Sequence, residues 1–401
     1  GQTVTFHLPL QPRNIMEPSH ELDELESLPD HTPAPAVDTS ISRRTYLRLI
    51  SAGFAFFVAG VNDGSLGALM PYILNTYHIG TNVVTAVYGT TFVGWLVAAL
   101  TNTLLSQYLD LGAMLILGVC FQILAHALRS WQPPFPLFVV TFFFASLGQA
   151  YQDTHANTFV ASVHGAHRWL GFIHAMYMAG CLVAPFMATA VASASSSTRW
   201  ALFYTAPLSL GCVNLMLASI AFYELVRARK GRQNAVPATS NTSRSQTALS
   251  EIRRILLNPA VWLLSLFFFF FLGAGITAGG WVVEYLVRVR KGDVVDMGYV
   301  PAGFYGGGFL GRLLLAEPTY RFGERRMIFI YVVLFLSELC GYLAQLMNSV
   351  PNIITEAVAI SLLGLFSGPF FATGISVGSK IFPPDIRSSA LGVKAQYYST
   401  A

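Results

Sequence analysis

Long apolar stretches recur along the chain and are separated by short polar segments. A transmembrane helix needs about 20 mostly apolar residues, because lipid offers its backbone no hydrogen-bond partners. The stretches that meet this requirement are 46–73, 83–107, 111–131, 135–162, 169–192, 199–223, 260–286, 297–316, 326–346 and 351–377. The pattern predicts an all-α membrane protein with about ten complete transmembrane helices.

The composition strengthens this prediction and excludes several classes of function. Charged residues make up only 11% of the chain, whereas soluble globular proteins carry about 25%. No dense basic patch indicates a nucleic-acid partner. The four cysteines lie inside apolar runs without CxxC spacing, so we expect no metal site and no disulfide framework. No nucleophile–base pair or phosphate-binding loop is visible, so we expect neither an enzyme nor a bound cofactor.

Polar segments divide the chain into four parts. Residues 1–44 are polar and acidic in composition, which predicts a disordered cytosolic tail. Residues 45–224 would form a six-helix bundle, 225–256 an Arg-rich cytosolic linker, and 257–401 a second bundle. With the N-terminus in the cytosol, most Lys and Arg residues fall on the cytosolic side, as the positive-inside rule requires. The basic cluster at 288–291 falls on the other side and departs from this rule.

The predicted fourth helix carries a polar stripe. Gln149, Gln152, Asp153 and Asn157 follow helical spacing and so share one face. Such a face cannot lie against lipid, so it lines a watery cavity or packs against another helix. Asp63, in the first helix, is either a proton or solute site or a structural hydrogen-bonding group, since an isolated carboxylate in lipid is costly.

Other polar side chains in the predicted helices are candidates for binding solute, and each has a structural alternative. His174 and Tyr177 share a face of the fifth helix, although His174 could simply bond a backbone carbonyl. Trp281 could be a residue of the membrane-interface belt, and Glu284 could pair with Arg288 one turn later. The full set of candidate solute-binding residues is Asn62, Gln149, Gln152, Asn157, His174, Tyr177, Trp281 and Glu284.

The loop after the eighth predicted helix is rich in glycine and arginine. Arginines here could bind the ends of neighbouring helices and close the cytosolic side, or they could serve as positive-inside anchors. The candidate gating residues are Gly311, Arg312, Arg321, Gly323, Arg325 and Arg326.

This loop resembles the signature of the major facilitator superfamily. Four further segments, 62–67, 152–161, 279–281 and 374–383, are similar to fungal relatives of the fucose:proton symporter, of the bypass-of-stop-codon type. The resemblance implies two six-helix bundles that alternate access to a site between them. It also implies that acids in the first and fourth helices, by position Asp63 and Asp153, serve proton coupling and solute binding.

The C-terminal end departs from the family. After Gly392 the family would continue an apolar helix, but this chain turns polar and ends at Ala401, so we expect a truncated second bundle. The favoured function is proton-coupled uptake of a small polar solute, such as a sugar, by a monomer in the plasma membrane or an internal membrane. The alternatives are a non-transporting receptor or sensor that keeps the fold, and a proton-antiport efflux pump.

Overall fold

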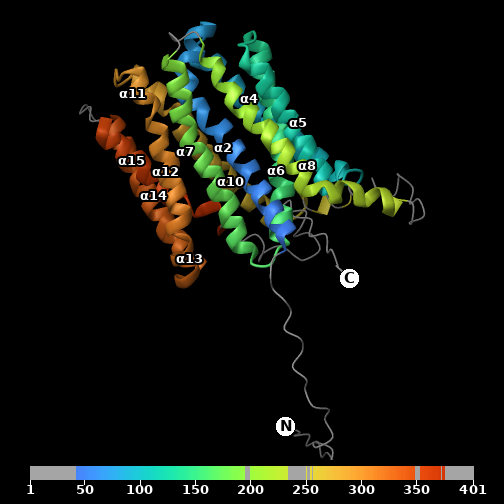
Figure 1. The fold of residues 1–401 in the computed structure, drawn as a ribbon. Helices are drawn as coiled ribbons and strands as arrows, with labels where there is room; N and C mark the ends of the chain where they lie inside the picture. The colour runs from blue at the N-terminus through green and yellow to red at the C-terminus, as the bar shows by residue number, and fades with distance from the viewer. Residues whose placement is uncertain are drawn as a thin grey trace, which may run out of the picture. The chain divides into compact units, whose positions relative to one another are not determined.

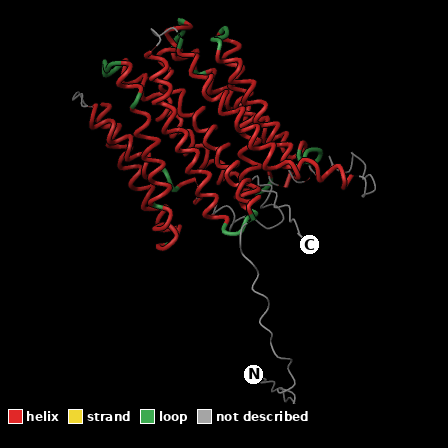
Figure 2. The backbone as a smooth tube through the Cα atoms, in the orientation of Figure 1, coloured by secondary structure: helices red, strands yellow, loops and turns green. Residues whose placement is uncertain are grey.

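The computed structural model describes residues 42–194, 199–233, 256–347 and 353–371, with isolated positions at 250, 253–254 and 373–374. Every regular element in this part of the chain is a helix (Figure 2). The helices are α2 (Arg43–Tyr77), α3 (Thr81–Val84), α4 (Ala86–Leu105), α5 (Leu111–Ser130), α6 (Phe135–Ala161), α7 (Ala166–Ala194), η1 (Trp200–Tyr204), α8 (Thr205–Gln233), α10 (Pro259–Arg288), α11 (Val294–Gly298), α12 (Val300–Leu314), α13 (Ala316–Phe322), α14 (Glu324–Met347) and α15 (Ile353–Ser367).

Each of the ten predicted stretches overlaps at least one of these helices. Within the described residues, seven segments are long and apolar enough to cross a membrane, and they fall in α2 to α8 and in α10. Two later helices, α12 and α15, have only 15 residues each. At 1.5 Å per residue, such a helix spans about 23 Å, which is less than the hydrocarbon thickness. The prediction of an all-α fold is confirmed, and seven of the ten expected spans meet the length and hydropathy of a membrane helix within the described residues.

Local sequence signals set the ends of the long helices. The Ser42 side chain accepts a hydrogen bond from the Thr45 backbone N–H and so caps the start of α2. His78 ends the same helix in the left-handed conformation, with φ of 52°. Asn258 caps α10, and Pro259 occupies its first turn, where its missing N–H is not needed.

Helix packing repeats along the chain. In the first half, α6 packs against both α4 and α5; in the second half, α15 packs against both α12 and α14 in the same chain order. The two halves meet where α10 contacts α2 and where α12 contacts α7. Figure 1 shows α7 and α12 side by side. This repetition is what two related bundles would produce.

The helix α8 extends past the end predicted for the first bundle. The first bundle was expected to end at residue 224, but α8 continues to Gln233, nine residues into the predicted linker. The remainder of that linker is mostly outside the described residues, as are the tail at 1–41 and residues 375–401. The predicted truncation of the second bundle, which concerns the chain after Gly392, therefore also lies outside them.

Candidate functional site

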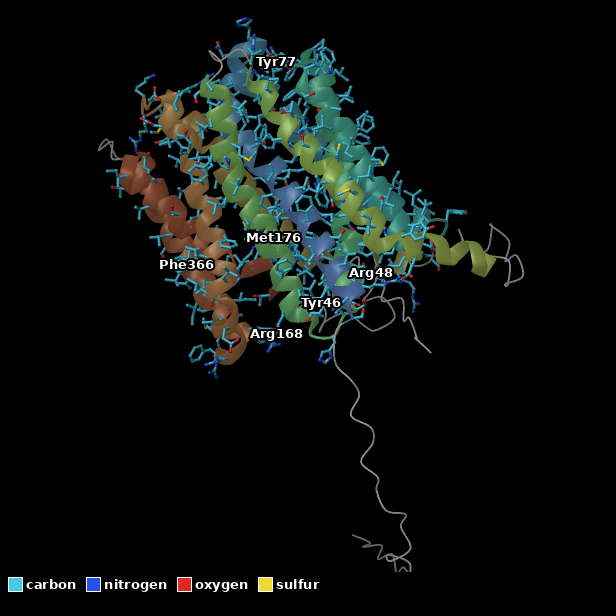
Figure 3. All side chains as sticks on the ribbon, viewed as in Figure 1. Tyr46, Arg48, Tyr77, Arg168, Met176 and Phe366 are labelled. Carbon is cyan, nitrogen blue, oxygen red and sulfur yellow. The ribbon has the colours of Figure 1, made fainter. Side chains whose placement is uncertain are left out.

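Asp63 lies near the middle of α2, between Arg48 and Tyr77, which Figure 3 places toward opposite ends of that helix. Its Oδ2 atom accepts hydrogen bonds from Gln149 Nε2 on α6 at 2.8 Å and from the Tyr177 hydroxyl on α7 at 2.9 Å. Asn62 Nδ2 donates to Oδ1 at 2.9 Å. Three helices thus direct donors at one partly buried carboxylate.

Small residues on α2 allow α7 to come this close. A Cβ atom on Gly64 would lie 2.6 Å from the Cys181 carbonyl oxygen, and one on Gly60 would lie 2.9 Å from the Cys181 nitrogen. Backbone atoms cannot move aside as a flexible side chain can. The pair of glycines therefore sets the distance at which Tyr177 reaches Asp63.

A second chain of hydrogen bonds begins at Asn62. Its Oδ1 atom accepts from Arg129 Nη1 on α5 at 2.9 Å. Arg129 is fully buried, and its Nε atom donates to Thr141 Oγ1 on α6 at 2.7 Å. The guanidinium lies 3.6 Å from the centroid of the Phe142 ring, a distance at which a cation is attracted by the ring face.

The polar stripe of α6 divides between two neighbourhoods. Gln149 faces Asp63, whereas Gln152 is 2% exposed and accepts hydrogen bonds from Gln122 on α5 and Asn214 on α8. Successive helical residues are rotated by about 100°, so the edges of the stripe face different neighbours. The position of Gln152 favours the helix-packing alternative over solute binding.

Asp153 lies one turn after Gln149 and is partly exposed, as is Asn157. No hydrogen bond or ion pair joins the Asp153 carboxylate to another described side chain. A partly accessible carboxylate in a membrane helix requires water or a polar partner in front of it. This placement is compatible with the predicted role in proton coupling, which stays a prediction.

Aromatic side chains gather where α10 meets the first half. The Trp281 ring lies 5.9 Å from the Tyr88 ring of α4, with an interplanar angle of 33°. One residue earlier, a Cβ atom on Gly280 would meet the Tyr88 hydroxyl, and one on Gly279 would meet the Tyr305 hydroxyl of α12. Trp281 therefore contacts the other half of the molecule, a location that a simple belt residue does not require.

Glu284 lies one turn beyond Trp281 and is 5% exposed. It forms the predicted i,i+4 ion pair with Arg288, which is confirmed. Both residues line a cavity of about 350 Å³, together with Pro71, Leu74, Asn75, His78, Ile79 and Val287. Asp63 does not line this cavity: it lies eight residues before Pro71 on α2, or about 12 Å along the helix axis.

The structure accounts for two charges of the basic cluster at 288–291. Arg288 pairs with Glu284, and Arg290 pairs with Glu356 on α15 at 2.6 Å. The Arg290 and Glu356 side chains are 9% and 3% exposed. These basic residues therefore neutralise interior acids, so the cluster is not simply a set of solvated surface charges.

Arg312 joins the two halves, because its Nη1 atom donates to the His174 carbonyl oxygen on α7 at 2.7 Å. The His174 ring packs between Phe56 and Phe371, with centroid distances of 5.2 and 4.7 Å. His174 thus faces aromatic side chains, and the structure does not bring it to Asp63. The arginine binds a carbonyl within α7 and not the end of a neighbouring helix.

Gly311, another predicted gating residue, is buried where α12 packs against α15, whereas the other four lie at the surface. Arg321 pairs with Glu317 one turn earlier, at 2.7 Å, and both side chains are exposed. Gly323 has a φ of 93°, a conformation that glycine adopts readily, and it separates α13 from α14. Arg325 and Arg326 are exposed in the first turn of α14. These surface positions fit positive-inside membrane anchors as well as residues that close the cytosolic side.

Comparison with known proteins identifies the family. Residues 52–399 match the profile of the Major Facilitator Superfamily. The chain belongs to this superfamily. Bypass of stop codon protein 6 of Saccharomyces cerevisiae is a relative, 28% identical over 433 aligned positions that cover 97% of this chain and 85% of that protein.

Solved structures of superfamily transporters share the fold. A variant of the E. coli fucose:proton symporter aligns with a TM-score of 0.62 at 17% identity, covering 87% of this chain and 88% of that one. A D-xylose-proton symporter aligns with the same TM-score at 12% identity, covering 86% and 85%. The protein is therefore an integral membrane protein with the major facilitator fold, as the resemblance implied.

Sequence analysis did not identify two interior residues, Arg129 and Tyr305. It did not single out Arg129, which lies near the end of an apolar stretch, yet this residue is fully buried. A signal was present: Gln122, His126 and Arg129 follow helical spacing, so they form a polar stripe inside a membrane segment. Tyr305 gave no comparable signal, because a tyrosine among glycines and apolar residues is common at a membrane boundary.

Proposed function

We propose that the protein is a secondary transporter that couples the uptake of a small polar solute, such as a sugar, to the movement of protons. The observation that carries the proposal is the carboxylate of Asp63, which receives donors from α2, α6 and α7. A carboxylate inside a membrane bundle is costly to bury, so such a residue is rare and marks a candidate functional site. Gly67, one turn further along α2, packs against Gly279 of α10, so the cluster lies close to the junction of the two halves.

The two acids have different surroundings, which supports different roles. Asp63 is surrounded by donors, an arrangement that fits an ionised carboxylate. Asp153 has no fixed donor among the described side chains and is partly exposed, so it can exchange a proton without breaking such contacts. Asp153 would carry the proton, and Asp63 would orient the solute and assist coupling.

The chemistry of the site suits a hydroxyl-rich solute. Carboxylate oxygens accept, the Gln149 and Asn62 amides both donate and accept, and the Tyr177 hydroxyl does the same. Trp281 and Tyr88 form an aromatic pair where α10 meets α4, and such a surface can pack against a sugar ring. The fucose:proton and D-xylose-proton symporters share the fold, which makes sugars the first solutes to test.

Alternating access would require the contacts between the halves to break and re-form. Arg312 holds α12 to α7 through a single hydrogen bond to a carbonyl, which can exchange with water at modest cost. Arg321, Arg325 and Arg326 would sit on the same side of the membrane as the N-terminus, and that side would be the cytosol. A monomer would suffice, since the proposed site is built from helices of one chain.

The test is a solute screen in proteoliposomes that enclose a pH-sensitive dye. The matching solute should acidify the lumen of vesicles with the wild-type protein, and Asp153→Asn should abolish the acidification. Asp296→Asn is the matched control, because Asp296 is exposed in α11 and should not alter the signal. Undiminished acidification by Asp153→Asn would overturn the assigned role.

The same experiment separates the alternatives. Solute binding by the purified protein with no flux in any vesicle would favour a receptor. Solute efflux driven by an inward proton gradient would favour antiport.

A further inference from the structure

Arg129 is an interior arginine of the first half that the proposed mechanism does not yet use. It lies in the last turn of α5 and is fully buried. Its contacts to Thr141 and to the Phe142 ring hold it in place but do not neutralise its charge. A charge inside a membrane bundle is stable only with compensation.

The compensating charge is reached through Asn62. Arg129 Nη1 donates to Asn62 Oδ1, and Asn62 Nδ2 donates to Asp63 Oδ1, each at 2.9 Å. Because a guanidinium cannot accept a hydrogen bond and a carboxylate cannot donate one, only this orientation of the Asn62 amide satisfies both neighbours. The amide therefore lies aligned between a cation and an anion.

Among the described residues, Asp63 forms no direct ion pair with any Lys, Arg or His side chain. The two other groups bonded to its carboxylate, Gln149 and Tyr177, are uncharged donors. Asp153, one turn along α6 from Gln149, is another acid, and His126 packs beside Arg129 on the Tyr204 ring. Arg129 is thus the basic group connected to Asp63 by an unbroken chain of hydrogen bonds.

We propose that Arg129 is the counter-charge of Asp63 and that Asn62 positions both groups by bonding to each. The role of Asp63 in transport rests on the proposed function, whereas the charge compensation stands on the geometry. Arg129 is a positioning residue in this arrangement, since it acts on the site through Asn62. It keeps a carboxylate available for solute in an interior that would otherwise disfavour it.

A double-mutant cycle tests the compensation without requiring transport. The variants are Arg129→Gln, Asp63→Asn and the two combined, and the measurement is the melting temperature of the full chain in detergent. Each single variant leaves one interior charge uncompensated and should melt several degrees below the wild type. The combined variant removes both charges, so its loss should be clearly smaller than the sum of the two single losses.

The control cycle combines Asp63→Asn with Arg312→Gln. Arg312 is also an interior arginine, but it bonds to the His174 carbonyl and not to Asn62. The decrease in melting temperature caused by Arg312→Gln should therefore add to the decrease caused by Asp63→Asn. If the decreases in melting temperature caused by Arg129→Gln and Asp63→Asn also add, the proposal is overturned, since a purely structural arginine gives that result.

Should Arg129→Gln alone fail to fold, the proposal remains testable. Adding Asp63→Asn to it should restore a monodisperse protein on size exclusion, and failure to do so would contradict the compensation. An absence of solute flux in every variant would defeat the proposed function but leave the result of the melting cycle unaffected.

Discussion

At the scale of single residues, the main feature is the Asp63 carboxylate, which accepts hydrogen bonds from three helices of the first half. The sequence predicted that Asp63, Gln149 and Tyr177 belong to the proton-coupling and solute-binding site. The structure brings their side chains together. The sequence could not predict that Gln152 bonds to α5 and α8 instead of Asp63. Helical spacing defines a stripe about 100° wide, and only the neighbouring helices decide which part of the stripe meets which partner.

Tyr177→Phe tests how far the proposed solute site depends on the phenolic donor. A hydrogen bond to a charged group contributes about 1.5–3 kcal/mol, so its loss should lower uptake at limiting solute by about tenfold or more. Tyr108→Phe is the control, because Tyr108 is exposed. Radiolabelled solute uptake in proteoliposomes provides the measurement, and equal uptake by the two variants would exclude a role for the Tyr177 hydroxyl.

At the scale of helices, close packing of α2 and α7 determines the geometry of the site. The sequence indicated this through small residues at 60, 64 and 67, which allow close helix approach in membranes. It could not say which helix approaches, because the same glycines fit any partner. The structure identifies α7 at Gly60 and Gly64, and α10 at Gly67.

Gly64→Ala should disrupt this packing. Its added methyl group would lie 2.6 Å from a backbone oxygen of α7, so the helices must separate and Tyr177 must move away from Asp63. We expect a lower melting temperature together with reduced uptake. Gly171→Ala on α7 is the control, since nothing lies within 4 Å of its added atom, and alanine favours a helix over glycine by about 1 kcal/mol. Equal melting temperatures would contradict the role of Gly64.

Glu356→Gln tests the buried ion pair that joins Arg290 to α15. Removing one partner of a buried pair costs about 3–5 kcal/mol, because the other charge loses its compensation. The exposed pair of Glu317 and Arg321 provides the control, since breaking a surface pair costs less than about 1 kcal/mol. Thermal melting of Glu356→Gln and Glu317→Gln should differ clearly, and similar melting would show that the Arg290 pair contributes little.

At the scale of the whole molecule, two helical halves meet along α2–α10 and α7–α12. The composition and the ten apolar stretches were enough to predict a helical membrane fold, because lipid permits few alternatives. The contacts between the halves could not be predicted, since they depend on side chains far apart in the sequence, such as Arg312 and His174.

A disulfide between the halves should stop transport if they move against each other. A Cβ atom on Gly298 would lie 3.3 Å from Thr189 Cβ, close to the separation in a disulfide of about 3.5–4.5 Å. In a background without the four native cysteines, Thr189→Cys with Gly298→Cys should lose uptake on oxidation and regain it on reduction. Neither single variant should respond to the oxidant. Full uptake by a protein with a verified cross-link would contradict alternating access.

The central claim is that Asp153 couples solute movement to protons, and counterflow tests it most directly. Exchange of labelled for unlabelled solute needs no net proton movement, so a neutral amide at 153 should still support exchange. We predict that Asp153→Asn keeps exchange near the wild-type rate and loses solute accumulation driven by a proton gradient. If Asp153→Asn accumulates solute as the wild type does, or loses exchange and accumulation together, Asp153 is not the coupling residue.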